Sequence, residues 1–279
     1  MKIITNELVQ KFKQYLTDEE KAIATTEKYI HDVKCFMVWI CGEEVTKAKV
    51  VKYKQKLIEK LAPSSVNSAL ASINSFFIFS GWYECRVKTI KIQQKVFLSE
   101  NKELTREEYM RLLDVSKQKK NKRLYYLLQT ICATGIRVSE LKYITVDAVR
   151  NGQAVINCKG KMRMIILTRN LCRALKDYIK RNKIKSGSVF VTKTGKPLDR
   201  SNIWSDMKKL CESANVDKAK VFPHNLRHLF ARTYYSVQKD IVRLADVLGH
   251  SSVNTTRIYT METGEIHRVC LEKLRLLKC

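Results

Sequence analysis

Residues 221–260 read VFPHNLRHLFARTYYSVQKDIVRLADVLGHSSVNTTRIYT, and their pattern predicts three helices joined by short turns. Pro223 can open the first helix, because proline in the first turn loses no backbone hydrogen bond. The apolar run 241–248 stops at Gly249, a residue suited to the left-handed end of a helix. Ser251 is then expected to cap a short third helix.

These three helices carry four reactive side chains in a fixed order. His224 and Arg227 are three residues apart, so they share a helix face. His250 follows in the turn after the second helix, and Tyr259 comes nine residues later. Each of these residues, taken alone, is more often a packing or solvated residue. Their joint order is what indicates a functional site.

A second motif lies upstream, in residues 133–144, which read ATGIRVSELKYI. Gly135 is expected to end one helix, and Arg137 and Glu140 then lie three residues apart on the next, with Leu141 turned inward. An Arg-x-x-Glu pair alone is usually a surface ion pair that contributes little energy.

Residues 145–167 change to a strand pattern. Because Asn151-Gly152 is a strong hairpin signal, the segment predicts a three-stranded antiparallel meander. Lys159 falls at the second turn, in a stretch that reads Lys159-Gly160-Lys161-Met162-Arg163.

Together, these motifs resemble those of the tyrosine recombinases, the phage integrase and Xer family. In that family the turn reads Lys-Gly-x-Lys-x-Arg and its lysine reaches the active site. The turn here is one residue shorter, which leaves Lys159 and Lys161 as candidates for this role. Lys159 is favoured because it directly precedes the glycine, and Lys161 is the alternative. Lys161 and Arg163 are also candidate DNA contacts. The resemblance implies a supporting role for Glu140 and a catalytic set of Arg137, Lys159, His224, Arg227, His250 and Tyr259.

The rest of the chain predicts a mainly α protein of two domains. Residues 1–98 show four amphipathic helices that would form a bundle, which in pattern resembles the SAM-like core-binding domain of the family. Lys47 and Lys54 of its third helix are candidates for phosphate contacts. Since the bundle starts within the first ten residues, no arm-binding domain is expected before it. A linker over 99–104 and a helical catalytic domain over 105–279, with its small three-stranded sheet, complete the expected fold.

Composition narrows the class of partner. The formal net charge is +26, and 37 basic against 17 acidic residues follow residue 98. Such an excess favours a polyanion, most simply nucleic acid. The nine cysteines are odd in number and contain no Cys-x-x-Cys, which is typical of reduced thiols in a cytoplasmic protein without a zinc site. Charges interrupt every apolar run, so no membrane span is expected.

The chemistry of these side chains fits phosphodiester cleavage. Arg137 and Arg227 could grip the non-bridging oxygens and offset charge in the transition state. A free tyrosine has a pKa near ~10, so Tyr259 needs a base, and His224 titrates in a suitable range. Lys159 could protonate the leaving 5′-oxygen, while His250 bonds the phosphate or the nucleophile. The resemblance implies a 3′-phosphotyrosyl intermediate that needs neither ATP nor metal.

Two other classes of function remain open. A non-catalytic helical DNA-binding protein would explain the charge, but it would leave the motifs as coincidence; a covalent adduct with nicked DNA would exclude it. A type IB topoisomerase shares the chemistry. Strand joining between two duplexes at a specific sequence, rather than general relaxation, would separate the two enzymes.

The end of the chain predicts an apolar helix over 264–279. Its stripe is formed by Ile266, Val269, Cys270, Leu274 and Leu277 at helical spacing. The stripe could pack on its own domain. The resemblance suggests docking into a neighbouring protomer instead, within a homo-tetramer assembled on a double-stranded DNA recombination site.

Overall fold

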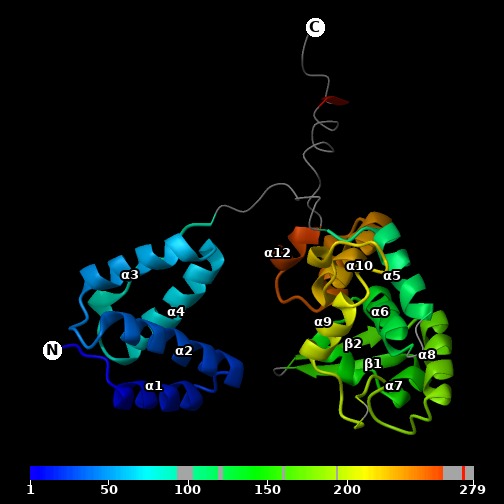
Figure 1. The fold of residues 1–279 in the computed structure, drawn as a ribbon, viewed down its shortest axis with the longest axis horizontal. Coiled ribbons are helices and arrows are strands. Elements are labelled where there is room, and N and C mark those ends of the chain that lie inside the picture. Colours follow the sequence, from blue (N-terminus) through cyan, green and yellow to red (C-terminus); the bar gives the residue numbers. More distant parts are fainter. Residues whose placement is uncertain (93–102, 119–121, 159–160, 193, 260–271, 274–279) are drawn as a thin grey trace. The chain divides into compact units, whose positions relative to one another are not determined.

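The computed structural model describes residues 1–92, 103–118, 122–158, 161–192, 194–259 and 272–273 (Figure 1). The chain divides into two compact units, Met1–Gln94 and Lys95–Cys279. Both units are mainly helical, as the sequence predicts.

The first unit is a bundle of four α-helices with a short 3-10 turn. Its core is built from the inward faces of these helices, and aromatic side chains fill much of it, with Phe12, Phe36, Phe76 and Phe77 fully buried. This confirms the predicted four-helix bundle. The elements are α1 (Asn6–Asp18), α2 (Ile23–Ile40), α3 (Lys47–Lys60), α4 (Pro63–Phe79) and η1 (Tyr83–Cys85).

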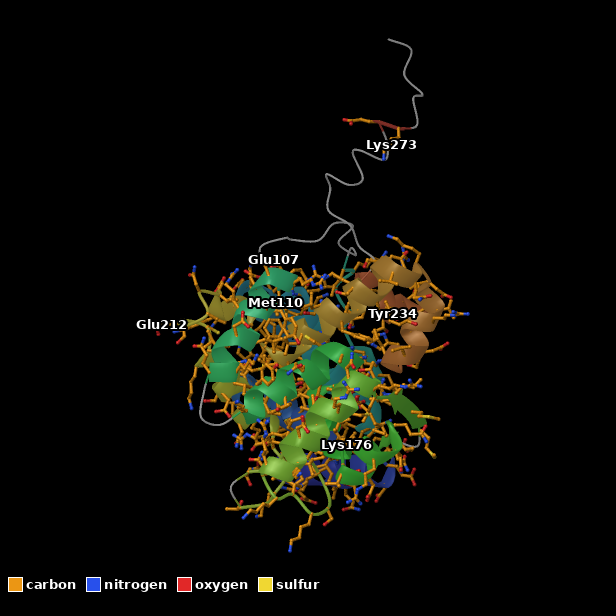
Figure 2. The ribbon with its side chains drawn as sticks, turned by 90° about the vertical axis from the view of Figure 1, so that its right-hand side faces the viewer. Glu107, Met110, Lys176, Glu212, Tyr234 and Lys273 are labelled. Carbon is orange, nitrogen blue, oxygen red and sulfur yellow. The ribbon has the colours of Figure 1, made fainter. Side chains whose placement is uncertain are left out.

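The second unit places most of its helices around one large apolar core. Helices α5 and α10 lie toward one end of this unit, and α7 with the two strands lies toward the other (Figure 1). Figure 2 shows the same separation from the side, with Met110 and Tyr234 near the upper end and Lys176 lower down. The elements before the site helices are α5 (Arg106–Gln118), α6 (Arg123–Thr134), η3 (Val138–Tyr143), α7 (Val146–Asn151), β1 (Gln153–Cys158), β2 (Lys161–Ile166), α8 (Arg169–Arg181), α9 (Arg200–Lys208) and η4 (Lys218–Lys220).

The small sheet has two strands in the described part of the chain, β1 and β2, which pair antiparallel from Gln153↔Ile166 to Cys158↔Lys161. The predicted first strand of the meander is wrong, because this segment forms α7. Thr145 caps that helix by accepting a hydrogen bond from the Ala148 backbone N–H at 3.0 Å. Gly152 ends it at φ 73°. An Asn-Gly pair is suited to a helix end as well as to a hairpin turn. Six residues are too few for hydrophobic periodicity to distinguish a helix from a strand.

The predicted three-helix arrangement of residues 221–260 is confirmed: α10 spans Pro223–Gln238, α11 spans Ile241–Leu248 and α12 spans Val253–Thr256. The cap of α12 is Ser252 rather than Ser251, and it accepts from the Asn254 N–H at 3.3 Å. A 3-10 turn, η5 (Arg257–Tyr259), carries Tyr259 directly after α12.

The end of the predicted linker packs against the second unit, just before α5 begins. Thr105 and Glu108 form the predicted capping box, with reciprocal hydrogen bonds of 2.8 and 3.2 Å. Leu104, which the sequence assigns to the linker, is fully buried in the main core. Glu103 beside it contacts α10. The last two residues of the predicted linker are therefore packed.

Two further expectations concern cysteines and membranes. Every cysteine whose side chain is described is unpaired. Among the helices that the structure describes, none is both long and apolar enough to cross a bilayer.

Candidate active site

Arg227 lies at the centre of the site, on the inward face of α10. It is 2% exposed and is the largest fully buried side chain described. Its guanidinium donates to the backbone oxygens of Gly135 and Leu248, which end α6 and α11, and lies 3.0 Å from His250 Nε2. Burial lowers its pKa to about 10, as does the charge of Arg137, so the group stays cationic at neutral pH. One buried cation thus joins the ends of α6 and α11 to the turn that carries His250.

Two glycines allow the chain to approach the arginines closely. Gly135 and Gly249 both adopt a left-handed conformation, with φ of 63° and 64°. A Cβ on Gly135 would fall 2.4 Å from the ring of Phe230, and one on Gly249 would fall 2.4 Å from Cδ of Arg163. Real side chains do not tolerate such contacts, so glycine is required for packing as well as for backbone conformation.

Glu140 links Arg137 to a third arginine, Arg163 of β2. Its carboxylate accepts from the Arg137 backbone N–H at 2.9 Å and from the Arg137 guanidinium at 3.0 Å, and it pairs closely with Arg163. Arg163 also donates to the Val247 backbone oxygen at 2.8 Å. The resemblance implies a supporting role for Glu140, and the structure pairs its carboxylate with Arg137 and Arg163.

The charge state of Glu140 follows from these contacts. The side chain is 4% exposed, and burial alone would raise its pKa. The hydrogen bond from the Arg137 backbone and the charge of Arg163 outweigh burial and hold the pKa below its usual range. Glu140 is therefore an anion that holds two cations in place. Arg137 remains 40% exposed at its side chain, so part of it faces solvent.

His250 is held in one neutral tautomer. Arg227 has only donors, so Nε2 must accept from it at 3.0 Å, and Nδ1 then carries the proton and faces Thr256 Oγ1 at 2.8 Å. Burial lowers the pKa of His250 to about 4, and the nearby Arg227 and Arg137 charges act in the same direction. The imidazole is neutral at pH 7.

Tyr259 is 3% exposed and packs with Ala231, Leu244 and Leu248. Its ring is stacked on that of His250, with centroids 6.0 Å apart. Its hydroxyl raises the pKa of Arg227 by charge and by a hydrogen bond. Arg227, His250 and Tyr259 therefore meet within one protomer.

His224 occupies the first turn of α10 and keeps an exposed edge. The packing around the rest of the ring lowers its pKa to about 4, as do His228 and Arg227. His224 contacts the ring of His228 at 4.5 Å between centroids, and it is His228 that contacts Tyr259, at 4.7 Å. Sequence reasoning missed His228. Its i, i+4 spacing from His224 was the available signal, because that spacing puts the two rings on one helix face.

The structure describes only some of the remaining predicted site residues. Lys159 lies outside the described residues, and of Lys161 only the backbone, in β2, is described. Lys47 is exposed on α3, and Lys54 donates to the Lys88 backbone oxygen at 2.8 Å.

An open cavity of about 680 Å³ lies beside these groups. Arg137, Arg163 and His250 line it together with Gly249 and Ser251. Arginine donors converging on a concave surface are well suited to a phosphate group. In the part of the chain that the structure covers, no cluster of metal-ligating side chains occurs.

Comparison with known proteins places this geometry in a family. Residues 102–265 match the phage integrase family, and residues 8–78 match its N-terminal SAM-like domain. The chain is 30% identical to tyrosine recombinase XerA of Thermococcus kodakarensis, over 98% of this chain and 97% of the relative. It is 32% identical to the XerA of Thermococcus onnurineus, with the same coverage.

Solved structures share the fold. A crystal structure of XerA recombinase aligns with a TM-score of 0.54 at 24% identity, covering 99% of this chain and all of that one. A lambda integrase (75–356) dimer bound to a COC′ core site aligns with a TM-score of 0.75 at 14% identity, covering 91% and 94%. With a family match over more than half of its length and relatives that it covers almost completely, the chain belongs to the phage integrase family of tyrosine recombinases, the enzymes that cleave and rejoin DNA strands in site-specific recombination.

Proposed function

We propose that this chain cuts DNA at its recombination site with Tyr259, forms a 3′-phosphotyrosyl bond and releases a 5′-hydroxyl. The observation that carries the proposal is that Arg227, His250 and Tyr259 meet, brought together by α10, the turn after α11 and η5. The covalent bond conserves the energy of the phosphodiester, so resealing needs no ATP.

Arg137 and Arg227 bind the scissile phosphate in this proposal. Both are cations at neutral pH, and their planar groups match two phosphate oxygens each. Glu140, which also pairs with Arg163, holds Arg137 in its position, and the carbonyls of Gly135 and Leu248 hold Arg227. Donors fixed before the reaction stabilise the developing charge without a cost for reorganisation.

The histidines handle the proton and the phosphate. With a pKa of about 4, His224 is neutral at pH 7 and is able to accept the phenol proton of Tyr259. His250 is equally neutral and contacts both Arg227 and Tyr259. In this proposal it bonds the phosphate by donating from Nε2, which requires its proton to move from Nδ1 to Nε2 when the phosphate replaces Nε2 as the acceptor for Arg227. Lys159, with Lys161 as the alternative, protonates the leaving 5′-oxygen.

The assignment of the general acid has a direct test. A substrate with a 5′-bridging phosphorothiolate has a leaving group that departs without protonation. We expect Lys159→Ala to cleave this substrate at the wild-type rate and to cleave the normal substrate about 10²–10⁴-fold more slowly. Single-turnover cleavage of both substrates measures the difference. If Lys161→Ala shows this pattern and Lys159→Ala does not, the shorter turn has moved the role by two residues.

The partner that fits this chemistry is double-stranded DNA. The solved relatives include recombinases bound to DNA, such as XerH bound to its difH substrate. The net charge of +26 supports the same partner, and exposed Lys47 on α3, with Lys54, offers phosphate contacts from the SAM-like unit. We propose the first unit as the core-binding domain and the second as the catalytic domain.

One experiment tests this function against its alternatives. Wild-type chain is incubated with a nicked duplex that bears its site, selected from DNA recovered with the protein, and denatured adducts are scored. A covalent adduct excludes a purely structural DNA-binding role. Joining of strands between two site-bearing duplexes, with no relaxation of supercoiled plasmid that lacks the site, distinguishes a recombinase from a type IB topoisomerase.

Assembly is the second part of the proposal. Exchange between two duplexes needs four cuts, so four copies of Tyr259 act in one complex. We propose that residues 264–279, most of which lie outside the described residues, dock into a neighbouring protomer of this tetramer. The support is the apolar stripe in their sequence and the position directly after the nucleophile.

Deleting residues 264–279 is expected to leave a folded chain that binds one site but fails to pair two sites, because its link to the neighbour is lost. Gel shifts that separate single-site from paired-site complexes measure this, and circular dichroism controls for folding. Full recombination by the truncated chain would refute the docking role. Misfolding would instead indicate that the helix packs on its own domain.

A further inference from the structure

A histidine outside the expected catalytic set lies against the nucleophile. His228 of α10 contacts the ring of Tyr259 edge to face, with centroids 4.7 Å apart and planes at 87°. It also contacts the ring of His224, with centroids 4.5 Å apart. The only ring contact between α10 histidines and Tyr259 within the described residues is the one made by His228. His228 therefore helps to position the Tyr259 ring, together with His250 and the apolar cluster around it.

Glu103 holds His228 through Nδ1. Its Oε1 lies 3.3 Å from Nδ1 of His228, and its side chain is 13% exposed. The hydrogen bond with His228 lowers the pKa of Glu103, and the charge of Arg232 adds to this against the effect of burial. Glu103 is thus an anion and can only accept, so Nδ1 of His228 must carry a proton. The carboxylate fixes both the orientation and the tautomer of the ring.

The opposite nitrogen of His228 has no partner. Nε2 is buried and forms no hydrogen bond with any described group. A buried polar atom without a partner costs free energy, and a fold usually avoids this. The open nitrogen belongs to a ring that contacts both His224 and Tyr259.

Glu103 reaches α10 because the stretch 103–104 is docked there. Leu104 is fully buried in the core, and its backbone oxygen accepts from Arg232 at 2.7 Å. Arg232 also pairs with Glu103 at 3.3 Å. His228 and Arg232 are four residues apart, so they present one face of α10 to this stretch. The stretch directly follows the segment that leads from the first unit.

We propose that Glu103 and His228 are positioning residues for Tyr259. Glu103 fixes the His228 imidazole through Nδ1, and the fixed imidazole sets the Tyr259 ring at the angle from which its oxygen attacks. The cleavage step thereby depends on a carboxylate supplied by the stretch 103–104, which is packed in the second unit. This inference rests on the proposed role of Tyr259 as the nucleophile.

The test compares single-turnover adduct formation on a nicked substrate for four variants. Glu103→Gln keeps the side-chain shape but loses the charge that selects the tautomer. His228→Phe keeps a ring beside Tyr259 but loses the bond to Glu103. The variant that carries both substitutions completes a double-mutant cycle. Glu108→Gln is the matched control, because Glu108 is 14% exposed and bonds Lys220 at 2.9 Å without contacting the site.

We expect Glu103→Gln and His228→Phe each to slow adduct formation about 10- to 100-fold, the effect of a misplaced reacting group. DNA affinity and the melting temperature of Glu103→Gln should match those of Glu108→Gln, which cleaves at the wild-type rate. The double variant should be no slower than the slower single variant, because Glu103 acts through His228. If His228→Phe fails to fold, the comparison of Glu103→Gln with Glu108→Gln decides.

Several results would overturn the proposal. A wild-type rate for Glu103→Gln, an equal loss in Glu108→Gln, or a double variant whose loss is the product of the two single losses would each do so. Rescue of Glu103→Gln by a 5′-bridging phosphorothiolate would also contradict it, because that substrate corrects departure of the leaving group and not attack. A wild-type chain that forms no adduct, in contrast, would refute the role of Tyr259 itself.

Discussion

Tyr259→Phe binds site DNA with unchanged affinity and forms no covalent adduct with a nicked substrate: this is the largest effect that we expect. The variant removes one oxygen and keeps the ring, so packing against Ala231, Leu244 and Leu248 persists. The loss of cleavage should be complete, because a phenyl ring has no nucleophile. Adducts resolved by denaturing gel electrophoresis, beside gel shifts for affinity, measure both quantities.

The control for this variant is Tyr234→Phe. Tyr234 lies on α10 and packs against the same small cluster as Tyr259, with part of its surface in solvent. It loses an identical hydroxyl and should cleave at the wild-type rate. Adduct formation by Tyr259→Phe would show that another residue attacks the phosphate.

Arg227→Lys is expected to have the second largest effect. Lysine lacks the planar group that bonds a phosphate while also reaching Gly135 and Leu248. Cleavage should fall by about 10²–10³-fold or more. The free energy of unfolding should fall by about 1–3 kcal/mol, because a buried carbonyl loses its partner. Single-turnover cleavage and denaturant unfolding measure the two losses.

Arg123→Lys is the control that separates loss of stability from loss of cleavage. Arg123 is also largely buried and bonds the Val191 backbone oxygen and Asp206, each at 3.0 Å, away from the site residues. It should lose stability without losing cleavage. A methylphosphonate at the scissile position removes one negative charge and should partly restore Arg227→Lys. Absence of any restoration would contradict direct contact between Arg227 and the phosphate.

The sequence predicts the helices of the site well because their ends carry explicit signals. Pro223 begins α10, where its missing N–H costs no hydrogen bond, and Gly249 ends α11, where glycine adopts the left-handed conformation without strain. The motif order also identifies Arg227, His250 and Tyr259, which the structure brings together. Local chemistry is readable from neighbouring residues.

Features that depend on long-range contacts are not readable in this way. The Arg163–Glu140 pair joins residues 23 apart, and the His228–Glu103 pair joins residues 125 apart. Neither pair has a spacing that marks it in sequence. The segment 145–151 fails for a different reason: its turn signal fits a helix end and a hairpin equally, and packing of Val146 and Val149 into the core selects the helix.

Mapping the covalent bond tests the central claim most directly. Wild-type chain trapped on a nicked substrate is digested with nuclease and trypsin, and the peptides are analysed by mass spectrometry. Trypsin releases residues 258–268, IYTMETGEIHR, in which Tyr259 is the single tyrosine. We predict a nucleotide joined through its 3′-phosphate to Tyr259, and a free 5′-hydroxyl on the other DNA fragment. A nucleotide on any other residue, or one joined through its 5′-phosphate, would contradict the mechanism.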